Sequence, residues 1–228
     1  MGDGQQEKIK RRLSDLGIKR GLAVDLDDTC FDTTRAYHEG LSANFPAPAD
    51  VTIEVLRMTY SLHGSLAYWN DIPEAVTRAH ALMENTTFNR EIHPLAGASA
   101  AVRRLQERGI ITCYKTARRE QMRGVTLEAL AKHGFPDLPL MMLEEDYPGW
   151  GHIEAKAMSL HASYPQILGI IDDSARLAKA VEQKGYPGEF FLFGLGAAHY
   201  QPQNGRVHLA RDWQDTEAKV MERYGQLP

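Results

Sequence analysis

The sequence predicts an α/β fold with a doubly wound, Rossmann-like parallel sheet and an inserted helical subdomain. Short apolar runs of about five residues recur along the chain and alternate with segments of helical apolar spacing. Strands that are apolar along their whole length are typical of parallel sheets buried on both faces. The insertion is predicted because about sixty residues separate the first two runs, whereas loops in such units usually have about 2–6 residues.

Six apolar runs are expected to form the strands of the sheet: residues 21–24, 110–114, 138–143, 167–171, 190–193 and 207–210. The segments between them have helical spacing. The expected helices are residues 97–108, 123–132, 152–162, 175–184 and 216–224. This alternation indicates repeated βαβ units.

The segment between the first two strands contains only helical patterns, at residues 35–44, 53–62 and 72–83. We therefore expect residues 1–34 and 94–228 to form the core of the fold. Residues 35–93 are expected to form a helical subdomain inserted between the first and second core strands.

Composition limits the possible classes of protein. The 228 residues include 43% hydrophobic and 25% charged side chains, which is typical of a globular domain with a sizeable core. The formal net charge of -4 gives no basic footprint for a nucleic acid polymer or an anionic membrane, so we expect neither as a partner. The two cysteines, Cys30 and Cys113, are expected to be buried free thiols. No pattern indicates an oligomeric state.

The first residues are polar and basic, without the apolar region of a secretory signal. The longest apolar stretch, residues 190–198, is about half of what a membrane span needs. We therefore expect a cytoplasmic location.

Acidic residues follow two of the expected strands. Asp25 and Asp27 come directly after the first, and Asp172 and Asp173 end the fourth. Ligands of open parallel sheets bind at the carboxyl ends of the strands, where the two acidic pairs can meet. Carboxylates at that distance repel one another unless a cation compensates, and oxygen ligands without Cys or paired His suit Mg²⁺.

The remaining candidates carry a hydroxyl or a positive charge. Thr116 and Arg118 follow the second strand, where a hydroxyl, a guanidinium and the start of a helix suit phosphate oxygens. Lys156, in the helix before the fourth strand, is a candidate counter-charge for the acidic site. Thr116 could equally cap the following helix, and Lys156 could be a solvated surface side chain.

The order of these residues resembles the four motifs of the haloacid dehalogenase-like hydrolase superfamily. Asp25-Leu26-Asp27-Asp28-Thr29 resembles the first motif, and Thr116, Lys156 and Asp172-Asp173 follow in the order of the other three. The resemblance covers the expected core, and the inserted helices fall where the family carries its helical C1-type cap.

The resemblance implies an Mg²⁺-dependent phosphatase with an aspartyl-phosphate intermediate. Asp25 would be the nucleophile and Asp27 the general acid and base. Asp25, the backbone carbonyl of Asp27 and Asp172 would hold Mg²⁺, supported by Asp173. Thr116 and Lys156 would hold phosphate oxygens. From its position, Arg118 is expected to be a further phosphate or substrate contact.

The expected substrate is a small phosphomonoester. The cap sequence Tyr68-Trp69-Asn70 would suit stacking on a base or sugar, so Trp69 is a candidate substrate contact and a nucleoside monophosphate is favoured. Other cap candidates are Arg57, Tyr60, His63, Arg78, Phe88 and Arg90. A sugar-phosphate phosphatase and a phosphomutase of the same superfamily remain alternatives.

Two readings lie outside this enzyme class. A non-catalytic module that binds a phosphate ligand is disfavoured because Asp25, Asp27, Lys156 and Asp172 are all present. A nucleotide-binding Rossmann or P-loop protein is disfavoured because residues 194–199 lack the third glycine and no Walker lysine pattern occurs.

Overall fold

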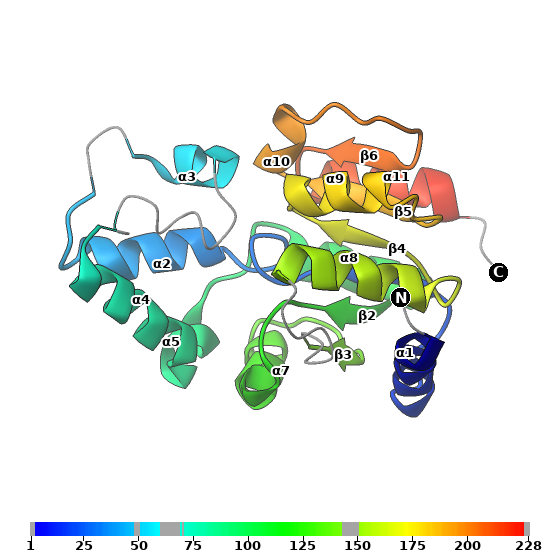
Figure 1. The fold of residues 1–228 in the computed structure, drawn as a ribbon, viewed down its shortest axis with the longest axis horizontal. Coiled ribbons are helices and arrows are strands. Elements are labelled where there is room, and N and C mark those ends of the chain that lie inside the picture. Colours follow the sequence, from blue (N-terminus) through cyan, green and yellow to red (C-terminus); the bar gives the residue numbers. More distant parts are fainter. Residues whose placement is uncertain (1–2, 48–50, 60–68, 70, 143–150, 226–228) are drawn as a thin grey trace.

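The structure is a computed structural model that describes residues 3–47, 51–59, 69, 71–142 and 151–225 (Figure 1). Its strands are β1 (Gly21–Val24), β2 (Ile111–Lys115), β3 (Leu140–Met141), β4 (Ile167–Asp172), β5 (Glu189–Phe193) and β6 (Val207–Ala210). Its helices are α1 (Asp3–Asp15), α2 (Thr33–Ser42), α3 (Ile53–Thr59), α4 (Pro73–Glu84), α5 (Thr86–Glu91), α6 (Ala98–Glu107), α7 (Arg123–Lys132), α8 (His152–Ser163), α9 (Ala175–Gln183), α10 (Leu195–Ala198) and α11 (Trp213–Tyr224), with a 3-10 turn at Glu120–Met122.

The six described strands form one parallel sheet in the order β3-β2-β1-β4-β5-β6. The predicted fold class is confirmed, because this order places β1 and β4 side by side at the centre, where the direction of winding reverses. A crevice at the carboxyl ends of the strands forms at such a switch point. The residues that follow β1, β2 and β4 therefore meet at one edge.

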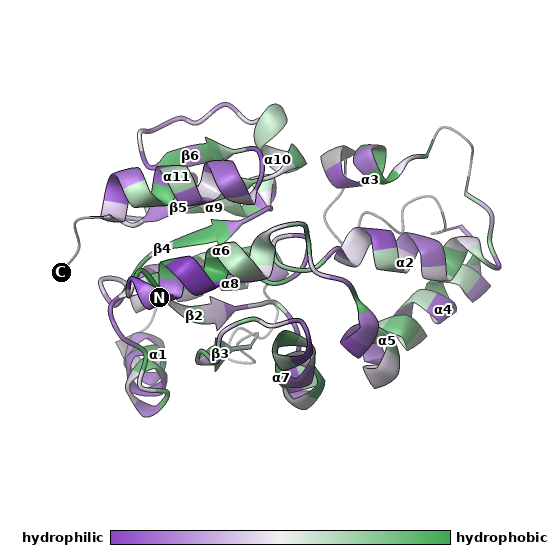
Figure 2. Ribbon diagram, turned by 180° about the vertical axis from the view of Figure 1, so that it is seen from behind, coloured by the Kyte–Doolittle hydropathy of each residue, from purple (hydrophilic) through white to green (hydrophobic). Residues whose placement is uncertain are grey.

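Helices cover both faces of the sheet, and successive residues of β1 face opposite layers. Leu22 and Val24 pack in one buried cluster with α6, α7 and α11, whereas Ala23 packs in the other with α1, α8 and α9. Figure 2 shows the central strand β4 largely in the hydrophobic colour, as expected for a strand between two layers of helices.

The helices α2 to α5, which we call the insert, lie together to one side of the sheet in Figure 1. α3 packs against α10 and α5 against α7, so both ends of the insert touch the rest of the molecule. The division into residues 1–34, 35–93 and 94–228 stays a prediction.

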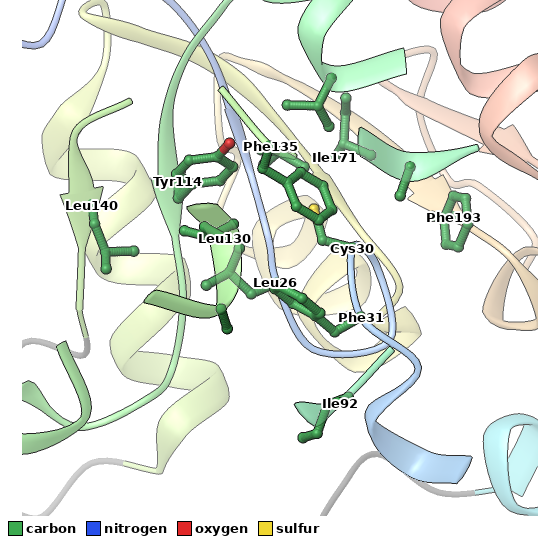
Figure 3. Close-up of a cluster of buried hydrophobic side chains, with 14 of the residues drawn as sticks. Leu26, Cys30, Phe31, Ile92, Tyr114, Leu130, Phe135, Leu140, Ile171 and Phe193 are labelled. Carbon is green, nitrogen blue, oxygen red and sulfur yellow. The ribbon is translucent and has the colours of Figure 1, made fainter. Parts of the chain in front are cut away.

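The buried cluster reaches the loop that follows β1. Leu26, Cys30 and Phe31 lie beside Tyr114 and Phe135, and none of the three is more than 1% exposed (Figure 3). This packing anchors a loop that also carries acidic side chains. Cys30 and Cys113 are buried free thiols, as predicted.

Three helices were not predicted from the sequence: α1, α5 and α10. α1 is polar except for a narrow stripe in which Ile9 and Leu13 are buried, one turn apart, so its apolar periodicity is weak. α5 and α10 span six and four residues, too few for periodicity to appear. No helix in the described part of the chain is long and apolar enough to cross a bilayer.

Candidate active site

Three carboxylates converge at the carboxyl ends of the two central strands. Asp25 directly follows β1, Asp172 ends β4, and Asp173 comes next. One carboxylate oxygen from each lies within 4.8 Å of the others. They meet because β1 and β4 are adjacent and parallel, and the backbone N–H of Asp25 donates to the carbonyl of Ile171 at 2.9 Å.

Lys156 of α8 supplies the counter-charge for this cluster. Its Nζ donates to Oδ1 of Asp25 and lies 2.7 Å from Oδ2 of Asp172. The side chain is 9% exposed, so it is not the solvated surface lysine of the alternative interpretation. Burial alone lowers the pKa of Lys156, but the charges of Asp172 and Asp25 outweigh it and raise that pKa above its ordinary value.

One lysine does not balance three clustered acids, of which Asp25 and Asp172 are buried. Burial and the charges of Asp172 and Asp27, opposed by Lys156, raise the pKa of Asp25 to about 7. Burial also raises the pKa of Asp173, as do the charges of Asp28 and Asp172. Oδ2 of Asp172 pairs with Lys156, the same ammonium group that contacts Asp25. A divalent cation with oxygen ligands fits this set of donors.

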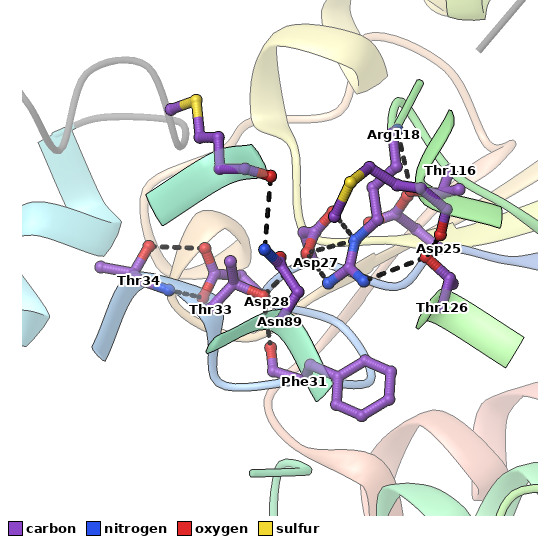
Figure 4. Close-up of polar contacts among 12 residues, drawn as sticks. Asp25, Asp27, Asp28, Phe31, Thr33, Thr34, Asn89, Thr116, Arg118 and Thr126 are labelled. Atoms are coloured by element: carbon purple, nitrogen blue, oxygen red, sulfur yellow. Dashed lines mark hydrogen bonds and ion pairs between the residues drawn. The ribbon is translucent and has the colours of Figure 1, made fainter. Parts of the chain in front are cut away.

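The loop after β1 turns sharply and directs its acids to different partners. Asp28 has φ of 55°, a left-handed conformation that Asp tolerates better than most residues. Its carboxylate accepts from the backbone N–H of Thr34 at 2.8 Å and from the Thr34 hydroxyl at 2.5 Å. Burial nevertheless raises the pKa of Asp28 to about 6. Asp28 therefore ties the loop to the first turn of α2 (Figure 4).

Asp27 lies apart from the three clustered acids and pairs with Arg118 (Figure 4). Nη2 of Arg118 donates to Oδ1 of Asp27 at 2.6 Å, and Nε lies 3.2 and 3.1 Å from Oδ1 and Oδ2. The hydroxyl of Thr33, at the start of α2, donates to Oδ1 at 2.9 Å. Burial alone raises the pKa of Asp27, but the charge and hydrogen bonds of Arg118, with Thr33, outweigh it and lower that pKa.

Asp172 and Asp173 do not cap the helix that follows them. The hydroxyl of Ser174 caps α9 by accepting from the N–H of Leu177 at 3.2 Å. Oδ1 of Asp172 instead accepts from the N–H of Ser174, and the N–H of Asp173 donates to the hydroxyl of Thr29 at 3.1 Å. Thr29 thus joins the loops after β1 and β4.

Thr116 is buried behind the site. Its backbone N–H donates to the carbonyl of Met141 at 3.0 Å, and its hydroxyl accepts from the N–H of Arg118 at 3.2 Å. Thr116 is not among the residues that line the cavity described below, although Arg118 is. The role of Thr116 as a phosphate contact stays a prediction.

Trp69 does not lie where the sequence interpretation placed it. It is 1% exposed, and its Nε1 donates to the carbonyl of Phe45 at 2.8 Å. Its ring lies beside His38, inside the insert. Trp69 is not among the residues that line the cavity described below, and its contact with substrate stays a prediction that this burial does not favour. A run of aromatic and amide side chains fits a subdomain core as well as a pocket wall. Tyr60, His63, Tyr68 and Asn70 lie outside the described residues.

A cavity of about 920 Å³ opens beside the carboxylates. Asp25, Asp27, Lys156, Asp172 and Asp173 are among the residues that line it. Residues of the insert also contribute to its wall: Tyr37, His80, Met83, Glu84 and Asn89. The charged groups of the first set can hold a cation, donate to anionic oxygens and move a proton.

Several of these residues were missed from the sequence. Thr33 and Thr34 follow Asp32, which caps α2, and this cluster of helix-capping residues is the one signal that could have drawn attention to them. Arg57 of α3 was expected as a candidate substrate contact in the inserted helices. In the structure it contacts Asp32 and lies 3.9 Å from Asp28. No pattern in the sequence indicates that Tyr37 or Asn89 lines the cavity, because tertiary packing decides this.

No protein-family model matches the sequence, and no curated protein matches it. Solved structures do. A haloacid dehalogenase-like family protein from Streptococcus pneumoniae aligns with a TM-score of 0.59 and 15% identity, covering 90% of this chain and 98% of that one. A HAD family hydrolase from Deinococcus radiodurans R1, with bound phosphate and sodium, gives 0.57 and 14% over 92% and 98% of the two chains.

A third structure is the HAD-hydrolase YfnB from Bacillus subtilis bound to magnesium, with a TM-score of 0.55 and 13% identity over 89% and 99% of the two chains. All three alignments span nearly the full length of both chains. The chain therefore has the fold of the haloacid dehalogenase-like hydrolases, the superfamily that its four motifs resemble.

Proposed function

We propose that this protein hydrolyses a small phosphomonoester and that Asp25 is its nucleophile. The observation that supports this most strongly is the buried cluster in which Lys156 contacts both Asp25 and Asp172. A buried carboxylate beside an ammonium group at the carboxyl edge of a parallel sheet is suited to attack on an anionic ester, because the ammonium reduces repulsion between the two anions.

The reaction has two steps. In the first, an oxygen of Asp25 attacks phosphorus, the bond to the leaving oxygen breaks, and Asp27 gives that oxygen a proton. In the second, a water oxygen attacks phosphorus and the bond to Asp25 breaks, while Asp27 takes the proton of the water. The products are an alcohol, inorganic phosphate, the carboxylate of Asp25 and the protonated carboxyl group of Asp27, which is the form in which Asp27 began the cycle. Lys156 and Thr116 hold phosphate oxygens during both steps.

Asp25, Asp172 and Asp173 would hold a divalent cation, which we propose to be Mg²⁺, with the backbone carbonyl of Asp27 as a further ligand. When bound, the cation supplies charge that offsets repulsion between Asp25 and the phosphate. The approach of one carboxylate oxygen from each of the three acids to within 4.8 Å, and the raised pKa values of Asp25 and Asp173, support a cation at this place.

The substrate is an organophosphate whose leaving group fits the cavity of about 920 Å³, a size usual for small-molecule sites. The stacking argument for a nucleoside monophosphate loses its support because Trp69 is buried. Nucleotides, sugar phosphates and phospho-amino acids therefore form one panel of candidates.

The test is release of phosphate from p-nitrophenyl phosphate and from that panel. We expect activity in Mg²⁺, loss of activity after treatment with EDTA, and recovery when Mg²⁺ is added back. Turnover that survives removal of the metal would contradict the proposed cation. A properly folded protein that releases no phosphate from any ester would contradict the proposed hydrolysis.

A further inference from the structure

Arg118 was expected to contact phosphate, but its surroundings suggest another role. Resting on the proposed function, we propose that Arg118 is a positioning residue that fixes the carboxylate of Asp27 for its proton transfers. In this role Arg118 acts through Asp27 and does not bind the phosphate group.

The guanidinium of Arg118 is held at all three nitrogens. Nε and Nη2 donate to the carboxylate of Asp27, and Nη1 donates to the hydroxyl of Thr126 at 3.3 Å. The side chain is 8% exposed, and its guanidinium lies 5.8 Å from the centre of the Phe31 ring. The edge formed by Nε and Nη2, which can hold an oxyanion through two parallel hydrogen bonds, is taken by Asp27. Three of the five N–H groups are therefore used by protein partners, which favours a role directed at Asp27.

The partners of Arg118 are themselves fixed. The hydroxyl of Thr126 donates to the carbonyl of Met122 at 2.8 Å, within the first turn of α7. Phe31 is buried against Phe135 and His133. Arg118 is therefore held by α7 and by the loop after β1. A guanidinium fixed in this way restricts the orientation of the Asp27 carboxylate that it binds.

The contacts of Asp27 distinguish its two oxygens (Figure 4). Oδ1 accepts from Nη2 and Nε of Arg118 and from the hydroxyl of Thr33, whereas Oδ2, among the described residues, accepts only from Nε, at 3.1 Å. A carboxylate oxygen has two lone pairs, so Oδ2 retains one for a transferred proton. Arg118 and Thr33 together therefore select Oδ2 as the oxygen that exchanges protons with the leaving group and with water.

The hydrolysis step should depend most on this arrangement. As the water oxygen bonds to phosphorus, the bond from phosphorus to Asp25 breaks and the proton of the water passes to Oδ2 of Asp27. A carboxylate that rotates freely spends less time in the orientation that accepts the proton. Misplacement of a reacting group by about 1 Å can cost about 100-fold in rate. With p-nitrophenyl phosphate the first step needs little acid assistance, so hydrolysis of the phosphoenzyme should limit turnover.

The experiment compares Arg118→Gln with Arg123→Gln. Replacing Arg123 removes the same charge, but Arg123 is not among the residues that line the cavity, and it pairs with Glu120 and with the carbonyl of Leu140. We expect Arg118→Gln to lower kcat for p-nitrophenyl phosphate about 100-fold, with KM changed by about two-fold or less. It should also produce a burst of nitrophenol equal to the enzyme concentration, because phosphoenzyme accumulates. Arg123→Gln should show neither effect.

Two further variants separate positioning from phosphate binding. In an Asp27→Asn background, Arg118→Gln should cause no additional loss, because a residue that acts only through Asp27 has nothing left to position. Thr33→Val should reproduce the burst with a smaller fall in kcat, about five-fold, since it removes one of the three contacts to Oδ1. Thr33→Val also tests the proposal if Arg118→Gln does not fold.

A rise in KM with unchanged kcat would identify Arg118 as a phosphate contact and overturn the proposal. Equal kinetics of Arg118→Gln and Arg123→Gln, or an independent loss in the Asp27→Asn background, would overturn it as well. In those cases the wild-type protein still releases phosphate, so the proposed function stands. If the wild-type protein releases none, the proposed function fails and this inference fails with it.

Discussion

The edge of the sheet and the insert use their polar side chains in different ways. At the edge, charged side chains contact one another: Lys156 bridges Asp25 and Asp172, and Arg118 holds Asp27. Inside the insert, polar side chains mostly satisfy backbone groups. Nδ2 of Asn89, for example, donates to the carbonyls of Leu82 and Asn85 at 3.0 and 2.8 Å. The sheet thus supplies the reacting groups, and the insert supplies an ordered wall of the cavity.

The largest effect on activity is expected when the proposed nucleophile at the edge of the sheet is removed. Asp25→Asn keeps the size of the side chain but removes its attacking anion, so we expect phosphate release to fall by at least about 1,000-fold. The measurement is turnover of p-nitrophenyl phosphate, with circular dichroism to establish that the fold is intact. Near-normal turnover in the folded variant would show that another group attacks phosphorus.

Two tryptophans provide a matched test of the two regions. Trp69 in the insert and Trp213 in α11 are both buried, and each donates its indole N–H to a backbone carbonyl, of Phe45 and of Thr29 respectively. Replacing either by Phe leaves a carbonyl without its partner, which should cost about 1–3 kcal/mol in the free energy of unfolding. Denaturation by urea measures this cost.

Activity should separate the same two variants. The carbonyl of Thr29 belongs to the loop that carries Asp27, so Trp213→Phe should also lower kcat. Trp69→Phe should leave kcat unchanged. A large rise in KM for the physiological substrate in Trp69→Phe alone would restore the original expectation that Trp69 contacts substrate.

The fold and the edge of the sheet were largely predictable from the sequence, and the reason is geometric. Each strand is a short apolar run, and the bounds of β1 and β6 agree with the prediction. Once the strands are known to be parallel, the residues that end them must lie at one edge. This alone predicts that Asp25 and Asp172 approach each other. The described part of β3 is shorter than predicted, Leu140–Met141, as is common for a strand at the edge of a sheet.

The insert was predictable only as a set of helices. Helical spacing shows that one face is apolar, but it does not show whether that face meets another helix or the cavity. The sequence therefore did not indicate that Trp69 is buried, and it did not indicate that Tyr37 and Asn89 line the cavity. At the edge of the sheet, the sequence likewise did not indicate which charged side chains pair with each other. No spacing rule indicates, for example, that Arg118 faces Asp27.

A smaller effect is expected from the link between the insert and the loop after β1. Arg57 of α3 contacts Asp32, the residue that caps α2, and both side chains are mostly sheltered from solvent. Arg57→Gln should lower the free energy of unfolding by about 1 kcal/mol. It should also lower kcat by about three-fold, because α2 begins at Thr33, which orients Asp27. Urea denaturation and steady-state kinetics measure the two effects, and an unchanged kcat would mean that this link does not influence Asp27.

The smallest effect should come from the second link, between Glu91 of α5 and Lys132 of α7. Both side chains are about half exposed, so water and salt screen their attraction, and neither contacts a residue at the edge of the sheet. Lys132→Gln should therefore leave both the midpoint of urea denaturation and kcat within experimental error. Arg57→Gln and Lys132→Gln each remove one positive charge from a contact of the insert. A difference in kcat between the two variants therefore reports where the contact lies and not the loss of charge. If Lys132→Gln lowered kcat as much as Arg57→Gln, attachment of the insert as a whole would control activity, and the specific path from Arg57 through Asp32 and Thr33 to Asp27 would be wrong.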